Sequence, residues 1–152
     1  MNKIEIIFNE FTGNCILLPE YNIEADLLEI SSKISRQWKY GMNINGNLIF
    51  DIDNDLKIAN CDLLIPKRLW KKKGRLPFDI ISEGQNYTDI SFSKSSIEIK
   101  NFNIEIEVFS FKDNVYILLD KPNKVVINKL SDKCEVLTFN NELKGFIVRD
   151  MQ

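Results

Sequence analysis

The chain has 152 residues, of which 44% are hydrophobic and 28% charged, with a formal net charge of −2 at pH 7. These values are ordinary for a globular protein and predict a single domain, 1–152, that buries a real core. The chain contains no histidine, which excludes the Ser–His and Cys–His dyads and the commonest metal ligand. We therefore expect no catalytic residues, no metal site and no cofactor; an enzyme built on paired carboxylates or lysine is the alternative.

No apolar run approaches the roughly 18 residues that a membrane-spanning helix needs. The first residues, MNKIEIIFNEF, carry charges within their apolar stretch and lack the small-residue cleavage site of a signal peptide. Cys15, Cys61 and Cys134 are odd in number and far apart, each in an apolar, strand-like stretch. We expect buried free thiols in a reducing cytoplasm, and no membrane partner.

Two strands are expected at the start of the chain, at Lys3–Phe8 and Cys15–Leu18, and Pro19 is expected to end the second. A helix is expected next, because apolar residues follow at spacings of 4, 3, 4 and 4: Ile23, Leu27, Ile30, Ile34 and Trp38. Asn22 would cap its first turn and Gly41 would end it. Trp38, as the last member of this stripe, is expected in the core.

Asn45-Gly46 lies between alternating apolar residues and predicts a hairpin. Further strands are expected at 56–65, 78–82, 87–93, 97–100, 124–128, 135–139 and 146–149. Turns at 83–86, 121–124 and 140–145 separate some of these runs at short, regular spacing. Such spacing favours an antiparallel meander.

The stretch 101–119, NFNIEIEVFSFKDNVYILL, predicts the central hairpin of the fold. Its apolar residues fall on even positions up to Val108, and the phase then flips to Phe109 and Phe111, which indicates a β-bulge. Lys112-Asp113-Asn114 is typical of a turn. The run 115–119 is apolar on both faces, as expected of a strand that is covered on both sides.

Together these patterns predict an α+β fold that is predominantly antiparallel β. We expect a β-sandwich or a strongly curved sheet, with one N-terminal amphipathic helix packed on it.

A basic segment interrupts the strand pattern between Pro66 and Pro77. It contains six basic residues around a tryptophan: Lys67, Arg68, Trp70, Lys71, Lys72, Lys73 and Arg75. Such a segment could bind a nucleic acid backbone and stack a base on the aromatic ring. It could also face an anionic membrane or an acidic partner, or form a solvated loop with Trp70 packed beneath it.

Outside this segment the chain is acidic. The segment holds six of the 20 basic residues, so the rest of the chain has 14 basic residues against 22 acidic ones. The acidic residues gather in two groups: Glu20, Glu24, Asp26 and Glu29, and Asp51, Asp53, Asp55 and Asp62. An acidic face would attract a basic protein, and the alternative is ordinary solubilising charge. We predict that the best candidates for contact with the partner are Asp51, Asp53 and Asp55, which we expect to be exposed at a strand end. Glu24 and Asp26 are the second-best candidates.

The run Asp51-Ile52-Asp53-Asn54-Asp55 is similar to the opening of a calcium-binding loop. The similarity ends at Leu56, which occupies the glycine position, and at Asp62, which occupies the position of the final bidentate glutamate. An EF-hand is therefore excluded, while a weak cation site is left open. Glycines are too scattered for a phosphate-binding loop.

In its small size, its lack of catalytic groups and its polarised charge, the chain resembles the small bacterial immunity proteins of contact-dependent and polymorphic toxin systems. Those proteins share no common motif, so the resemblance covers the whole chain and transfers no residue. It implies a cytoplasmic inhibitor of a cognate protein toxin that is often a basic nuclease. We expect the protein itself to be a monomer or a weak dimer. The alternative is a small β-rich protein that binds nucleic acid through the basic Trp70 segment, although the acidic remainder of the chain disfavours that partner.

Overall fold

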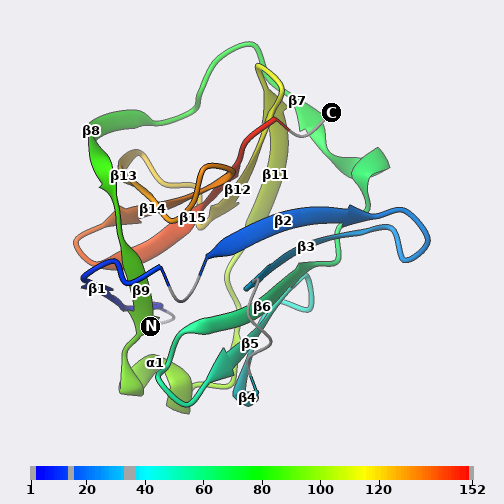
Figure 1. Ribbon diagram of the computed structural model, residues 1–152. Coiled ribbons are helices and arrows are strands. Elements are labelled where there is room, and N and C mark those ends of the chain that lie inside the picture. The colour runs from blue at the N-terminus through cyan, green and yellow to red at the C-terminus, as the bar shows by residue number, and fades with distance from the viewer. Residues whose placement is uncertain (1–2, 14–15, 33–36, 151–152) are drawn as a thin grey trace.

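The computed structural model describes residues 3–13, 16–32 and 37–150, and these form an almost entirely β protein (Figure 1). Strands account for 59% of the described residues and helical elements for 6%. The two helical elements are one 3-10 turn, η1 (Lys67–Leu69), and one short helix, α1 (Lys94–Glu98). No helix among the described residues is long and apolar enough to cross a membrane.

Two larger sheets make up most of the fold. The six-stranded sheet runs in the order β10 (Asn101–Phe102), β4 (Trp38–Ile44), β5 (Leu48–Asp53), β6 (Ile58–Leu63), β3 (Leu27–Ser32) and β2 (Leu17–Asn22). The seven-stranded sheet runs in the order β7 (Lys71–Lys72), β11 (Ile106–Phe111), β12 (Asn114–Leu119), β15 (Glu142–Val148), β14 (Cys134–Phe139), β13 (Lys124–Lys129) and β8 (Asp79–Tyr87). A third sheet pairs β1 (Ile6–Asn9) with β9 (Asp89–Phe92).

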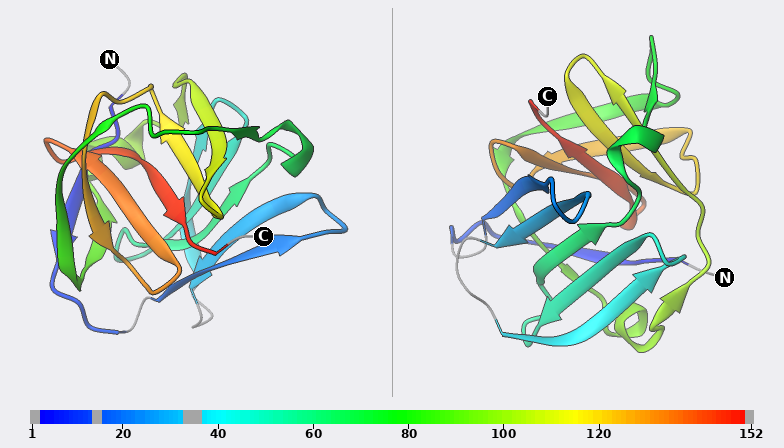
Figure 2. Two further views of the ribbon diagram at one scale, coloured as in Figure 1. Left: turned by 90° about the horizontal axis from the view of Figure 1, so that it is seen from above. Right: turned by 90° about the vertical axis from the view of Figure 1, so that its right-hand side faces the viewer.

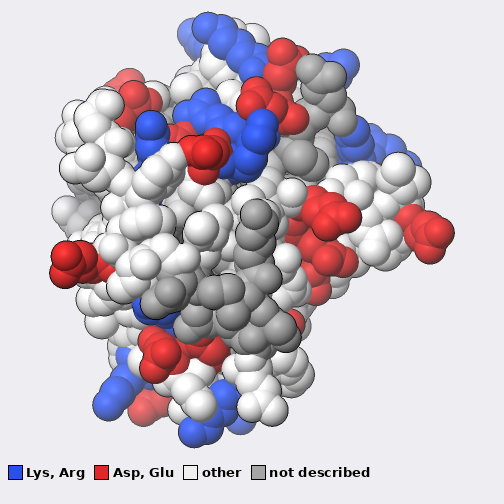
Figure 3. All heavy atoms as spheres, in the orientation of Figure 1, with Lys and Arg blue, Asp and Glu red and all other residues white. Residues whose placement is uncertain are grey.

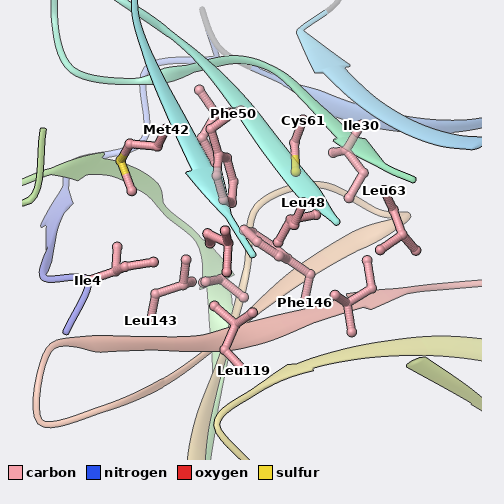
Figure 4. Packing of buried hydrophobic residues seen from close by; sticks show 14 of the residues in the cluster. Ile4, Ile30, Met42, Leu48, Phe50, Cys61, Leu63, Leu119, Leu143 and Phe146 are labelled. Atoms are coloured by element: carbon pink, nitrogen blue, oxygen red, sulfur yellow. The ribbon is translucent and has the colours of Figure 1, made fainter. Parts of the chain in front are cut away.

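The main core lies where the inner faces of the two larger sheets meet (Figure 4). Phe50 and Cys61 enter it from the six-stranded sheet, and Phe146 and Leu119 enter it from the seven-stranded sheet. The Phe50 ring is 6.0 Å from that of Phe146, centroid to centroid. Because interiors are close-packed, truncating either ring to alanine would cost about 3–5 kcal/mol.

The predicted α+β class is wrong, because the stretch expected to form the N-terminal helix is a β-hairpin. β2 and β3 are joined by a turn at 23–26, and β3 pairs with β6 through Leu28 opposite Leu63 and Ile30 opposite Cys61. Leu28 and Ile30 point into the core on alternate positions, as a strand requires. Ile23 and Trp38, the ends of the expected stripe, are 83% and 62% exposed. Ile34 lies outside the described residues.

Four smaller expectations are also corrected. Pro19 lies inside β2 and does not end it, which is tolerated because β2 is an edge strand and needs no outward N–H donor. The expected turn at 83–86 is part of the continuous strand β8, and the expected strand at 97–100 overlaps α1. Gly41 lies within β4 and ends no helix.

The hairpin at Asn45-Gly46 is confirmed, and both residues have the positive φ values, 53° and 72°, that a tight hairpin turn favours. The central hairpin is confirmed too, with Lys112 and Asp113 in its turn at φ 49° and 65°.

The bulge expected between Val108 and Phe109 is absent from the pairing of β11 with β12, which is regular throughout. The phase flips instead because the sheet is covered on both faces. Val108 packs in the main core, whereas Phe109 packs in a second cluster with Tyr116 and Phe78 on the opposite face. The prediction that 115–119 is buried on both sides is confirmed.

Candidate protein-binding surface

Four carboxylates from four strands share the outer face of the six-stranded sheet. Glu20 on β2 lies opposite Glu29 on β3, and Glu29 lies opposite Asp62 on β6. Asp51 on β5 lies opposite Asn60, so that it is the diagonal neighbour of Asp62. All four point outward, because they alternate with the buried residues of their strands. We call Glu20, Glu29, Asp51 and Asp62 the acidic sheet face.

The acidic sheet face is electrostatically unfavourable to the isolated protein. Like charges directly opposite one another on a sheet are destabilising, and two such pairs follow each other here, Glu20–Glu29 and Glu29–Asp62. The pKa of Asp51 is raised, mainly by partial burial and secondly by the Asp62 carboxylate. A hydrogen bond with Asn60 lowers this pKa, but by less than the other two effects raise it. Within the described part of the chain, none of the four carboxylates takes part in an ion pair.

The hairpin β2–β3 extends this acidic region beyond the body of the protein (Figures 1 and 2). Its turn carries Glu24 and Asp26, both exposed. The turn is ordered by local bonds: the Ala25 N–H donates to Asn22 Oδ1 at 3.0 Å, and the Tyr21 hydroxyl donates to Asp26 Oδ1. Acidic atoms gather over β2 and β3 and at the tip of this hairpin (Figure 3).

The structure separates the predicted acidic residues into different roles. Asp51 belongs to the acidic sheet face, and Glu24 and Asp26 lie at the hairpin tip. Asp53 is only 4% exposed, and its Oδ1 accepts hydrogen bonds from the Asp55 N–H at 2.9 Å and the Lys57 N–H at 3.0 Å. It was expected to be exposed, but it orders the β5–β6 turn. Asp55 is exposed in the same turn.

Sequence reasoning did not place Glu20, Glu29 and Asp62 in the predicted site. The signal was present in the alternation Leu28, Glu29, Ile30, which marks a strand with its polar residue outward. Reading this stretch as a helix concealed that signal.

Trp70 faces inward. Its Nε1–H donates to the Ile65 carbonyl at 2.9 Å, and its ring meets that of Tyr21 edge to face, with centroids 5.9 Å apart. The ring therefore packs against Tyr21, next to the hairpin turn, and against the main core. It is not the exposed aromatic platform that a nucleic-acid binder needs.

Part of the basic segment is likewise engaged within the protein. Lys71 and Lys73 form ion pairs with Glu107 at 3.4 and 3.3 Å, and Lys73 Nζ lies 5.1 Å from the centroid of the Phe109 ring. Lys67 Nζ lies 5.4 Å from the centroid of the Tyr21 ring. Arg68, Lys72 and Arg75 are exposed. The segment therefore contacts two parts of the fold. Lys67 and Trp70 contact Tyr21 of the hairpin, and β7 pairs with β11 at one edge of the seven-stranded sheet.

The described residues contain no cluster of three or more side chains that could hold a metal ion. One cavity of about 280 Å³ contains Glu142, but Lys3 and Lys144 bind that carboxylate at 3.2 and 3.1 Å. Burial raises the pKa of Glu142, and the hydrogen bonds and charges of the two lysines lower it further than burial raises it. A carboxylate held ionised by two lysines is poorly suited to act as a general acid.

A scan against protein-family models finds no family that matches this sequence, and a search of curated proteins finds no similar one.

Proposed function

We propose that this protein is a non-catalytic binding module that acts in the cytoplasm as an immunity protein, binding and inhibiting a cognate toxin that is a basic nuclease. The observation that carries this proposal is the acidic sheet face. The fold aligns Glu20, Glu29 and Asp62 although their mutual repulsion costs stability. A basic partner would convert this cost into attraction, and complementary potentials would speed its encounter with the protein.

The nuclease class of the partner rests on charge and on the resemblance to immunity proteins. A surface that binds phosphates is rich in lysine and arginine, and carboxylates arranged in a row can occupy the places that phosphates would take. Nucleic acid is disfavoured as the partner of this protein itself. The acidic sheet face repels phosphates, and Trp70 is packed beneath the basic segment.

The test neutralises two neighbouring members of the acidic sheet face in the double variant Glu29→Gln, Asp62→Asn. A matched control, Glu105→Gln, Asp113→Asn, changes the net charge equally but lies at the β11–β12 hairpin and the segment before it. The probe is the C-terminal domain, inactivated by mutation, of the protein encoded by the gene immediately upstream, which the proposal expects to be a secreted toxin. Binding is measured by calorimetry and stopped-flow at low and physiological salt, and protection by growth of cells that express the active toxin domain.

We expect the acidic-face variant to associate about tenfold more slowly at low salt, with a weaker salt dependence, while the control stays close to the parent. If these carboxylates meet arginine or lysine at a desolvated contact, the loss of binding free energy should reach about 2–5 kcal/mol. Equal behaviour of the two variants would move the binding surface elsewhere. Failure of the parent to bind the toxin domain would refute the immunity function.

A further inference from the structure

The β2–β3 hairpin ends in an exposed apolar residue. Ile23 is 83% exposed, the largest exposed fraction among the large hydrophobic residues of the described chain. It lies in the turn of a hairpin that protrudes from the body of the protein in Figure 1 and in the left view of Figure 2. Glu24 and Asp26 follow it in the same turn. An isoleucine held away from the core in this way contributes little to folding, because it removes almost no apolar surface from water.

The hairpin is also held in place next to its turn, at Tyr21. Tyr21 contacts the edge of the Trp70 ring, and Trp70 is fixed by its hydrogen bond to Ile65. The Tyr21 hydroxyl donates a hydrogen bond to Asp26, and the Asn22 side chain accepts one from the N–H of Ala25. Through Trp70, these contacts connect the turn to the main core. A loop fixed in advance loses less conformational entropy when it binds.

The edge of the hairpin is closed to one common mode of binding. β2 is the edge strand of its sheet, but Pro19 at its centre has no backbone N–H. It therefore cannot donate a hydrogen bond to the carbonyl of an added strand. Addition of a strand there is therefore disfavoured. The surfaces left for contact are the acidic sheet face and the tip itself.

We infer that the β2–β3 hairpin enters a basic cleft of the partner protein, with Ile23 as an apolar tip that fills the floor of the cleft and with Glu24 and Asp26 against its basic walls. The inference rests on the proposed function and adds a mechanism of inhibition, which is occlusion of the cleft that binds nucleic acid. Charge complementarity favours this partner, because residues 17–32 hold four carboxylates and no lysine or arginine.

The test compares Ile23→Ser with Ile81→Ser. Ile81 is the matched control, 54% exposed on β8 at the opposite side of the molecule in Figure 1. Both variants should fold as the parent does, since neither side chain is buried. The probe is again the inactivated toxin domain from the upstream gene, with a fluorescent oligonucleotide as competitor for its cleft.

We expect Ile23→Ser to bind at least tenfold more weakly and to lose the same factor in competition against the oligonucleotide, while Ile81→Ser matches the parent. The loss should not change with salt, because it is apolar, whereas the loss in Glu29→Gln, Asp62→Asn should. If the parent and the oligonucleotide bind together, or if Ile23→Ser binds like the parent, the insertion of the hairpin is refuted while the proposed function stands. If the parent does not bind the toxin domain at all, both are refuted.

Discussion

Replacing Asp53 by alanine should destabilise the fold, although the sequence places this residue in an acidic run that resembles a solvated or metal-binding loop. Its Oδ1 accepts two backbone N–H bonds, from Asp55 at 2.9 Å and Lys57 at 3.0 Å, and the side chain is almost fully buried. A hydrogen bond to a charged group contributes about 1.5–3 kcal/mol. Since the turn is partly open to water, we take the lower end for each and expect a total loss of about 2–4 kcal/mol.

That loss would be a large part of the 5–15 kcal/mol typical of a whole domain. Asp53→Asn keeps an acceptor oxygen at the same place and should lose only about 1 kcal/mol. Glu24→Ala is the control, because this carboxylate is exposed at the hairpin tip, and it should stay within about 0.5 kcal/mol of the parent. The three variants are compared by urea unfolding, followed by tryptophan fluorescence and circular dichroism, with equal slopes required for a valid comparison.

An Asp53→Ala variant as stable as Glu24→Ala would show that the two backbone bonds contribute nothing, and the assignment of Asp53 to the turn would be wrong. Weaker toxin binding by a well-folded Asp53→Asn variant would return this residue to the binding surface.

Two further predictions concern the interior. Gly145 has φ +147°, and a Cβ there would lie 1.9 Å from the Ile117 carbonyl oxygen, so Gly145→Ala should destabilise the fold by about 2–6 kcal/mol through backbone strain and displacement of β12. The control is Gly46→Ala, where φ is positive but the space around the Cβ is open, and it should cost only about 1–2 kcal/mol. Equal urea midpoints for the two variants would refute the clash at Gly145. Burial raises the pKa of Cys134 to about 12 and that of Cys61 well above its ordinary value. At pH 8 neither thiol should therefore react with iodoacetamide until the protein unfolds, which peptide mass spectrometry would show. Rapid labelling of either cysteine in the native protein would contradict its burial.

The features that could be predicted from the sequence are those set by a few neighbouring residues. Asn45-Gly46 forms a hairpin turn because asparagine and glycine tolerate positive φ, which is a local property. The turn at Lys112-Asp113 was predictable from the Asp113-Asn114 pair, since aspartate and asparagine favour turns. The burial of 115–119 on both faces was also predictable, because an unbroken apolar run has no polar residue to turn toward water. Cys61 and Cys134 are buried and free, as their apolar settings indicated, whereas Cys15 lies outside the described residues.

The features that the sequence left ambiguous depend on pairing between distant strands. The spacing of Ile23, Leu27 and Ile30 matches a helical stripe, but packing of Leu28 and Ile30 against β6 stabilises a strand instead. The same pairing decides the candidate site, because only the register of β2, β3, β6 and β5 brings Glu20, Glu29, Asp62 and Asp51 onto one face. Composition determined that the protein would be acidic outside one basic segment. Tertiary structure decided where that charge lies, since a one-residue change of register in any of these strands would have turned the carboxylate of that strand toward the core.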